Sequence, residues 1–205
     1  MASVTRRTRR KAPEDRATIH ETLTTAMERL LAHGHSFTSL SVAVLAAEAG
    51  IGRSTFYTHF RDKGHLVHHL MQAVAAEIVL AGDPWFSSPE TGTRDDLRKA
   101  IAGIAGVYRR HYAVMAAVLE TASYDAEVKK LFDDMMTKLC ATSRTMLKRL
   151  QASGQAPAQL GDETADALTW MVERCCHQVL QTRSTTKREK VIDSLTTIIW
   201  RTFIG

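Results

Sequence analysis

The chain has 205 residues, of which 44% are apolar, and this is enough for an ordinary globular core. Its N-terminus is charged and no window approaches about 18 uninterrupted apolar residues, so we expect no secretory signal, no membrane span and a cytoplasmic location. Four prolines and eleven glycines among many helix formers favour an all-α fold of about nine helices, and the formal net charge is +5.

The positive charge is concentrated near the N-terminus. Residues 1–63 hold ten basic and six acidic side chains, whereas the rest of the chain holds seventeen and sixteen. Residues 1–12 are too charged and too poor in apolar side chains to fold alone, so we expect a flexible arm there. Such an arm is either a solubilising tail or, next to a DNA-binding unit, a DNA contact. Its basic residues are Arg6, Arg7, Arg9, Arg10 and Lys11.

The first helix is predicted from Pro13 to about Ala32. A proline followed by two acidic residues suits a first helical turn, where N–H groups lack partners and the helix dipole favours negative charge. An apolar stripe begins at Ile19, and Gly34 follows the end of the helix. Phe37 is then well placed to fill the core of a small helical unit.

Two short apolar-patterned segments lie within residues 40–60, on either side of an Ala-Gly-Ile turn. Ser41 stands at the N-cap position of the first segment, and Gly50 ends it where a positive φ is often required. In the second segment Phe56 and Phe60 share one side, and short polar or basic residues occupy the rest. This is the pattern of a helix-turn-helix, so double-stranded DNA is the expected partner and the arm is expected to contact DNA backbone or minor groove.

Residues 50–60, GIGRSTFYTHF, with Lys63 and Leu66 behind them, resemble the signature of TetR-type transcriptional repressors. The signature is long and specific, and it covers about the first third of the chain. Gly52 departs from it, because the family usually has a serine N-cap there. Glycine caps a helix only a few tenths of a kcal/mol less well, so the helix is expected to form without the hydroxyl that could contact a phosphate.

The second segment is the predicted recognition helix. Arg53 can bind O6 and N7 of a guanine with two hydrogen bonds. The residues expected to reach base edges are Arg53, Ser54, Thr55 and Thr58. The residues expected to contact phosphates are Ser41, Tyr57, His59 and Lys63.

A fourth helix is predicted over residues 62–81, capped by Asp62, and it completes a DNA-binding domain at 13–81. Residues 82–93, GDPWFSSPETGT, contain two of the four prolines and two of the eleven glycines, so we expect a loop and a domain boundary there. Trp85 and Phe86 are expected to pack on the larger domain, and the alternative is that they close a ligand pocket.

Helical patterns resume near Asp95 and define a regulatory domain at 94–205. A long helix is predicted from about Asp125 to Ser153, and the last two helices over 161–182 and 187–203. These two carry more apolar surface than one buried stripe needs. Burial of the last helix in its own core would explain this. The TetR resemblance implies instead a homodimer through these helices, bound to a palindromic operator.

The helices of this domain are rich in methionine and aromatic residues, which usually means plain core. TetR repressors, however, usually keep an apolar pocket there, and residues 167–174 and 197–200 look like those of the EthR-like actinobacterial subgroup, which has a hydrophobic ligand channel. Thr169 and Val172 replace amide side chains of that subgroup, and Leu97 replaces an aromatic. The residues expected to line a site for a small apolar effector are Leu97, Ile104, Tyr108, Met136, Leu139, Thr169, Val172 and Trp200.

No metal site or cofactor is expected. The three cysteines form no C-x-x-C pair, so reduced, partly buried thiols are expected, with a redox switch at Cys175 or Cys176 as the alternative. His65, His68 and His69 share helical spacing but have no carboxylate or thiolate expected nearby, which favours solvated or interfacial histidines.

The sequence thus predicts a homodimeric, sequence-specific repressor that a small apolar ligand releases from DNA. The alternative is an architectural or activating DNA-binding protein without a ligand. An enzyme is not expected, because there is no Ser-His-Asp order, H-E-x-x-H motif or glycine-rich phosphate loop in a supporting context.

Overall fold

The computed structural model of the chain describes residues 13–179 and 184–205, so the predicted arm at 1–12 lies outside the described residues. Within this part the chain forms nine α-helices and one π-helical turn and has no strand, which confirms the all-α class. The helices are α1 (Pro13–Ala32), α2 (Val42–Glu48), α3 (Arg53–His59), α4 (Lys63–Phe86), α5 (Arg94–Arg110), α6 (Tyr112–Thr121), α7 (Ala126–Ala152), α8 (Asp162–Arg174) and α9 (Thr185–Phe203), with the π turn η1 (Cys175–Val179) after α8.

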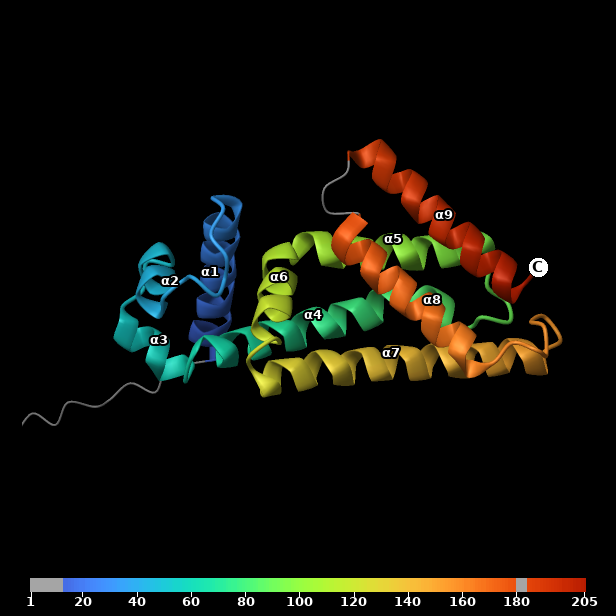
Figure 1. Cartoon of the computed structure of the whole chain (residues 1–205), viewed down its shortest axis with the longest axis horizontal. Coiled ribbons are helices and arrows are strands. Elements are labelled where there is room, and N and C mark those ends of the chain that lie inside the picture. Colours follow the sequence, from blue (N-terminus) through green and yellow to red (C-terminus); the bar gives the residue numbers. More distant parts are fainter. Residues whose placement is uncertain (1–12, 180–183) are drawn as a thin grey trace, which may run out of the picture.

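Helices α1, α2 and α3 gather at one end of the molecule, where they form a headpiece (Figure 1). Phe37 fills its core and is fully buried. Ser41 caps α2 as predicted, since its Oγ accepts a hydrogen bond from the Val44 N–H at 3.2 Å. Gly50 has a φ of +66°, which a residue with a Cβ adopts only with strain. The helix-turn-helix geometry predicted from the sequence is therefore present.

Helix α4 leaves the headpiece and runs on through the body as one continuous helix (Figure 1). Asp62 caps it, with Oδ1 accepting a hydrogen bond from the His65 N–H at 2.8 Å. The prediction that it ends near residue 81 is wrong, because it continues through Pro84 to Phe86. A proline this close to a helix end costs one hydrogen bond, to the carbonyl of Leu80, and that residue is 72% exposed and open to water. The loop is therefore confined to residues 87–93.

The body is built around α4, which packs against α5, α6 and α7. Two outer helices complete it, since α8 lies on α7 and α9 lies on α5 (Figure 1). The prediction of a single α-helix over 161–182 needs correction, because α8 ends at Arg174 and the π turn follows. Over a single turn the apolar spacing of an α-helix and a π-helix is nearly the same, so periodicity does not separate them.

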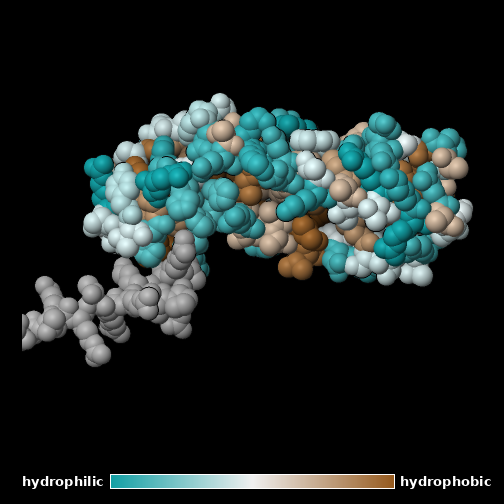
Figure 2. Space-filling view, turned by 90° about the horizontal axis from the view of Figure 1, so that it is seen from below, coloured by the Kyte–Doolittle hydropathy of each residue, from teal (hydrophilic) through white to brown (hydrophobic). Residues whose placement is uncertain are grey.

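Most of the face seen in Figure 2 is hydrophilic, with apolar side chains emerging in a few places. Large apolar side chains that are exposed in the body include Val79, Leu80, Trp170 and Ile198. None of the helices in the described part of the chain combines the length and the apolar content that a membrane crossing requires.

Candidate DNA-binding surface and ligand cavity

Helix α3 has one buried side and one open side. Phe56 and Phe60 point into the headpiece core and are 0% and 1% exposed, with their ring centroids 5.5 Å apart. Arg53, Ser54, Tyr57 and Thr58 are exposed, whereas Thr55 and His59 are half-buried. The two phenylalanines thus fix the rotation of the helix, and four of the polar residues predicted to contact DNA, Arg53, Ser54, Tyr57 and Thr58, lie on its outer side, whereas Thr55 and His59 are only partly accessible.

Hydrogen bonds already made within α2 and α3 limit what the hydroxyl groups can offer to DNA. The Thr58 hydroxyl donates to the Ser54 carbonyl at 2.9 Å, so without breaking this bond it can only accept from a base. The Ser41 hydroxyl accepts from a backbone N–H and keeps its own proton for a phosphate oxygen. The Arg53 guanidinium lies 5.6 Å from the centre of the Tyr57 ring, which restrains both side chains.

Lys63 has a different environment from the one expected for a phosphate contact. Its ammonium donates hydrogen bonds to the carbonyls of Phe37, Thr38 and Leu40 at 3.0, 3.1 and 2.5 Å. An ammonium has three N–H donors, so these bonds use all of them. Burial lowers the pKa of Lys63. We therefore withdraw Lys63 from the phosphate contacts, because its side chain ties α4 to the segment between α1 and α2.

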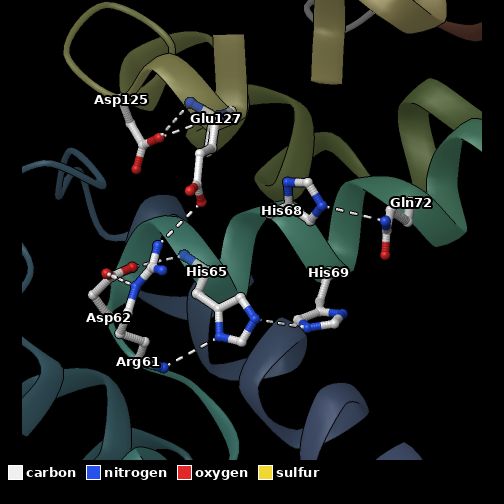
Figure 3. A network of polar contacts seen from close by, with 9 residues as sticks. Arg61, Asp62, His65, His68, His69, Gln72, Asp125 and Glu127 are labelled. Carbon is white, nitrogen blue, oxygen red and sulfur yellow. Dashed lines mark hydrogen bonds and ion pairs between the residues drawn. The ribbon is translucent and has the colours of Figure 1, made fainter. Parts of the chain in front are cut away.

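A group of polar contacts joins the headpiece to the body. Arg61, between α3 and α4, contacts Asp62 and also Glu127 at the start of α7, with N–O distances of 3.0 Å in both cases (Figure 3). The Thr38 N–H donates to Oε2 of Glu120 in α6 at 3.0 Å. The end of α3 and the start of α4 are therefore held against α6 and α7 as well as by the continuity of α4.

Two of the three histidines with helical spacing, His65 and His69, are in contact on α4. The Arg61 N–H donates to Nδ1 of His65, so the neutral ring carries its proton on Nε2 and donates it to Nε2 of His69, 3.0 Å away (Figure 3). His68 bonds instead to Gln72. No group of three potential metal ligands was found in the described ranges.

A cavity lies inside the body and offers about 710 Å³ of atom-free space, counting its open mouth. Its wall is mostly apolar, as it is in most small-molecule sites. Helices α4, α5, α7, α8 and α9 all contribute to it. The lining residues are Ile78, Trp85, Phe86, Leu97, Ala100, Ile101, Ile104, Tyr108, Leu139, Ser143, Met146, Ala165, Leu168, Thr169, Val172, Glu173, Ile199 and Phe203.

Six of the eight residues predicted to bind a ligand line this cavity: Leu97, Ile104, Tyr108, Leu139, Thr169 and Val172. Met136 and Trp200 do not. Met136 is buried in the core, and the Trp200 ring lies 5.9 Å from the ring of Trp85, which does line the cavity. A helical stripe indicates which side of a helix is buried, but whether a residue meets a cavity or packed atoms depends on the neighbouring helices.

The sequence left open whether Trp85 and Phe86 pack on the larger domain or close a ligand pocket. Both line the cavity, and Trp85 is 1% exposed. The Trp85 ring is close to Gly92, where an added Cβ would come within 3.0 Å of it. The end of α4 therefore both packs on the body and forms one wall of the cavity.

Sequence reasoning missed two polar lining residues, Ser143 and Glu173. The Ser143 hydroxyl is hydrogen-bonded to that of Thr169 at 2.8 Å, and Thr169 also donates to the Ala165 carbonyl. Glu173 is 4% exposed, and burial raises its pKa. The signal for Glu173 was its position, because it follows Ala165 and Thr169 at steps of four on the inner side of α8.

The cysteines are held as thiols. Cys140 and Cys176 are buried and Cys175 is half-buried. Burial raises the pKa of all three, which disfavours the reactive thiolate form. This environment favours the structural interpretation over a redox switch.

Two family models match the chain. Residues 97–205 match the C-terminal domain of the transcriptional regulator EthR, and residues 23–70 match bacterial regulatory proteins of the tetR family. The headpiece and the body are thus matched separately.

Individual relatives and solved structures are also transcriptional regulators. The chain is similar to the HTH-type transcriptional regulator EthR of Mycobacterium tuberculosis, with 29% identity over 171 residues that cover 82% of this chain and 77% of that one. EthR of Mycolicibacterium smegmatis is 26% identical over 202 residues, covering 98% and 91%. A transcriptional regulator from Saccharomonospora viridis, solved in complex with choline, has the same fold with a TM-score of 0.71 at 20% identity, covering 95% of this chain and 100% of that one. The chain therefore belongs to the TetR family of transcriptional regulators and carries a C-terminal domain of the EthR kind.

Proposed function

We propose that this regulator is a homodimeric repressor that binds a palindromic operator and is released when a small, mainly apolar ligand enters the cavity. One observation carries the proposal. Helix α4 begins at the headpiece with Lys63 and reaches the cavity with Ile78, Trp85 and Phe86. A ligand that moves the end of this helix moves the headpiece with it. We retain the division into a DNA-binding part from residue 13 and a regulatory part from residue 94, with α4 shared by both.

The DNA contacts follow from the outer side of α3. Arg53, Ser54, Thr55 and Thr58 are proposed to read bases, with Arg53 recognising a guanine and Thr58 accepting from a base amino group. Ser41, Tyr57 and His59 are proposed to contact phosphates, and the arm at residues 1–12 to add contacts that carry no sequence preference.

The homodimer is proposed to form through α8 and α9. Each helix keeps a large apolar side chain exposed, Trp170 at 41% and Ile198 at 46%. A two-fold interface buries the same surface on both subunits and presents two copies of α3. Sedimentation of the purified protein should give the mass of a dimer.

Release from DNA requires a ligand that binds two conformations unequally. The cavity wall formed by α4 is the moving part in this proposal. The contacts of Arg61 with Glu127 and of Thr38 with Glu120 hold the headpiece in one position relative to α6 and α7. A shift of α4 would change both contacts and alter the spacing of the two recognition helices.

The test combines footprinting with ligand titration. The protein should protect a palindromic sequence in intergenic DNA, such as that next to its own gene, and ligands that raise its melting temperature should also weaken operator binding. The Arg53→Ala protein is the matched control, since it should bind the same ligands while its base preference changes. Ligands that stabilise the protein and never alter operator binding would contradict the proposal.

A further inference from the structure

The carboxylate of Glu173 is the least satisfied polar group of the cavity wall. The side chain is 3% exposed, and neither of its oxygens accepts a hydrogen bond from any of the described residues. Its nearest charged neighbour is Arg174, with an N–O distance of 3.8 Å, and the side chain of Arg174 is 51% exposed. An ion pair this long and this solvated compensates little of the cost of burying a carboxylate.

The other polar groups of the cavity wall donate no hydrogen bond to Glu173. Ser143 and Thr169 are hydrogen-bonded to each other, and Thr169 also bonds to its own helix. Tyr108 lies close enough for the negative charge of Glu173 to add to the burial that raises the pKa of Tyr108. The fold therefore places an acceptor-only group in an apolar cavity, and residues 13–179 and 184–205 provide no donor for it.

We propose that the cavity takes an amphiphilic organic cation, a quaternary or bulky amine with an apolar tail, whose charged group lies against Glu173. This inference rests on the proposed function, because it names the ligand class of the same cavity. The tail would lie along the apolar wall formed by residues such as Ile101, Leu139 and Met146.

The energetic argument favours an organic cation over other ligands. Folding has already removed water from the Glu173 carboxylate, so a binding cation has to lose only its own water. A quaternary ammonium is weakly hydrated, and the aromatic rings of Trp85, Phe86 and Tyr108 in the wall can stabilise it further. A metal ion would find one carboxylate where it needs several ligands, and an anionic amphiphile would be repelled.

The experiment uses the full-length protein and three probes with the same tail. Octyltrimethylammonium, octanol and octyl sulfate differ chiefly in the charge of the head group. Calorimetric titration should show that the cation binds at least about tenfold more tightly than octanol, the factor expected for one desolvated interaction with a charged group, and that octyl sulfate binds more weakly than octanol. Equal or weaker binding of the cation would overturn the inference.

Two variants locate the effect at Glu173. Glu173→Gln keeps the shape and Glu173→Leu removes the polar atoms, and both should lower the affinity for the cation about tenfold or more while leaving that for octanol unchanged or higher. Glu163→Gln is the control, since it removes a carboxylate from an exposed position of the same helix. Cation binding that is the same in the wild type and in Glu173→Gln would also overturn the inference. The comparison of the three probes uses the wild-type protein, so it decides the matter even if a variant folds poorly.

Operator binding separates this inference from the proposed function. If the cation binds through Glu173 but does not change operator affinity, the ligand class stands and the proposed mechanism of release falls. If octanol weakens operator binding to the same extent as the cation does, the proposed mechanism of release stands and the proposed ligand class is wrong.

Discussion

The headpiece and the body treat a charged side chain inside the fold in opposite ways. Where α4 meets the headpiece, Lys63 has all three of its N–H groups bonded to headpiece carbonyls. In the body, Glu173 is more deeply buried and accepts no hydrogen bond from the described part of the chain. Both side chains lie on helices and both have a pKa shifted by burial towards the neutral form.

This difference distinguishes a buried charge with a full set of hydrogen-bond partners from one with none among the described residues. A buried charge with a full set of partners makes one arrangement of the backbone much better than any other. A buried charge without partners lowers stability, and buried groups with perturbed pKa values cluster at functional sites. The partners of Lys63 thus hold the start of α4 in one arrangement, and the lone carboxylate of Glu173 supports the proposal that the cavity receives a ligand.

The largest expected effect is on the headpiece. Lys63→Met should lower the free energy of unfolding by about 2 to 4 kcal/mol, because it leaves three carbonyls without their charged donor. Urea denaturation measures this. Lys138→Met, at an exposed position of α7, is the control and should change stability by less than about 0.5 kcal/mol. A similar small effect for Lys63→Met would show that water replaces the ammonium and would remove the contrast with Glu173.

In the body, a substitution of the buried charge is expected to raise stability instead of lowering it. Glu173→Leu should raise the free energy of unfolding at neutral pH by about 1 to 3 kcal/mol, because it removes a lone buried carboxylate from an apolar wall. Urea denaturation again measures the change, with Glu163→Leu as the exposed control on the same helix. A loss of stability as large as that of Lys63→Met would mean that Glu173 has a structural partner after all.

The pH dependence sharpens this second prediction. Burial raises the pKa of Glu173 above its usual value of 4.5, so just above that pH the folded protein keeps a proton that the unfolded chain has released. The contribution of this group to stability is therefore present below pH 4.5 and is lost as pH rises through the raised pKa. In Glu173→Leu this loss should be absent. If the stability of Glu173→Leu fell with rising pH as much as that of the wild type, the loss would have to come from titratable groups other than Glu173.

DNA recognition is expected to depend on the open side of α3. Arg53→Ala should cost about 1 to 3 kcal/mol of operator binding and relax the preference at one base pair, because a bidentate contact is lost. A base-preference profile from selected DNA measures it. Tyr57→Phe serves as the comparison. It is proposed to lose a phosphate contact, so it should weaken binding to all DNA sequences by about the same factor. An unchanged base-preference profile for Arg53→Ala would contradict the proposal that Arg53 contacts a base.

The smallest effect is expected at the turn between α2 and α3. Gly50→Ala should destabilise the protein by about 1 to 2 kcal/mol, because its φ of +66° is unfavourable for alanine although no atom obstructs a Cβ. Gly106→Ala, inside α5 with ordinary contact distances around the new Cβ, should instead stabilise it by about 0.5 to 1 kcal/mol. If both substitutions had the same sign, the strain assigned to the turn would be absent.

Local patterns were enough for much of the headpiece. The caps Ser41 and Asp62 and the turn at Gly50 occupy the positions predicted for them, because each depends on hydrogen bonds or dihedral angles within a few residues. The end of α4 at Phe86 was missed because proline is tolerated inside a helix where the freed carbonyl is exposed, as it is at Leu80, and exposure depends on packing.

The sequence by itself determined that the chain is all-helical, that it carries a helix-turn-helix and that it resembles the TetR family, since these follow from periodicity, caps and a contiguous motif. Only the tertiary structure decided that Lys63 holds backbone carbonyls, that Met136 and Trp200 lie outside the cavity and that Glu173 lies inside it with no hydrogen-bond donor among the described residues. The reason is that partners from other helices, far away in the sequence, determine whether a side chain is satisfied, packed or left facing an empty space.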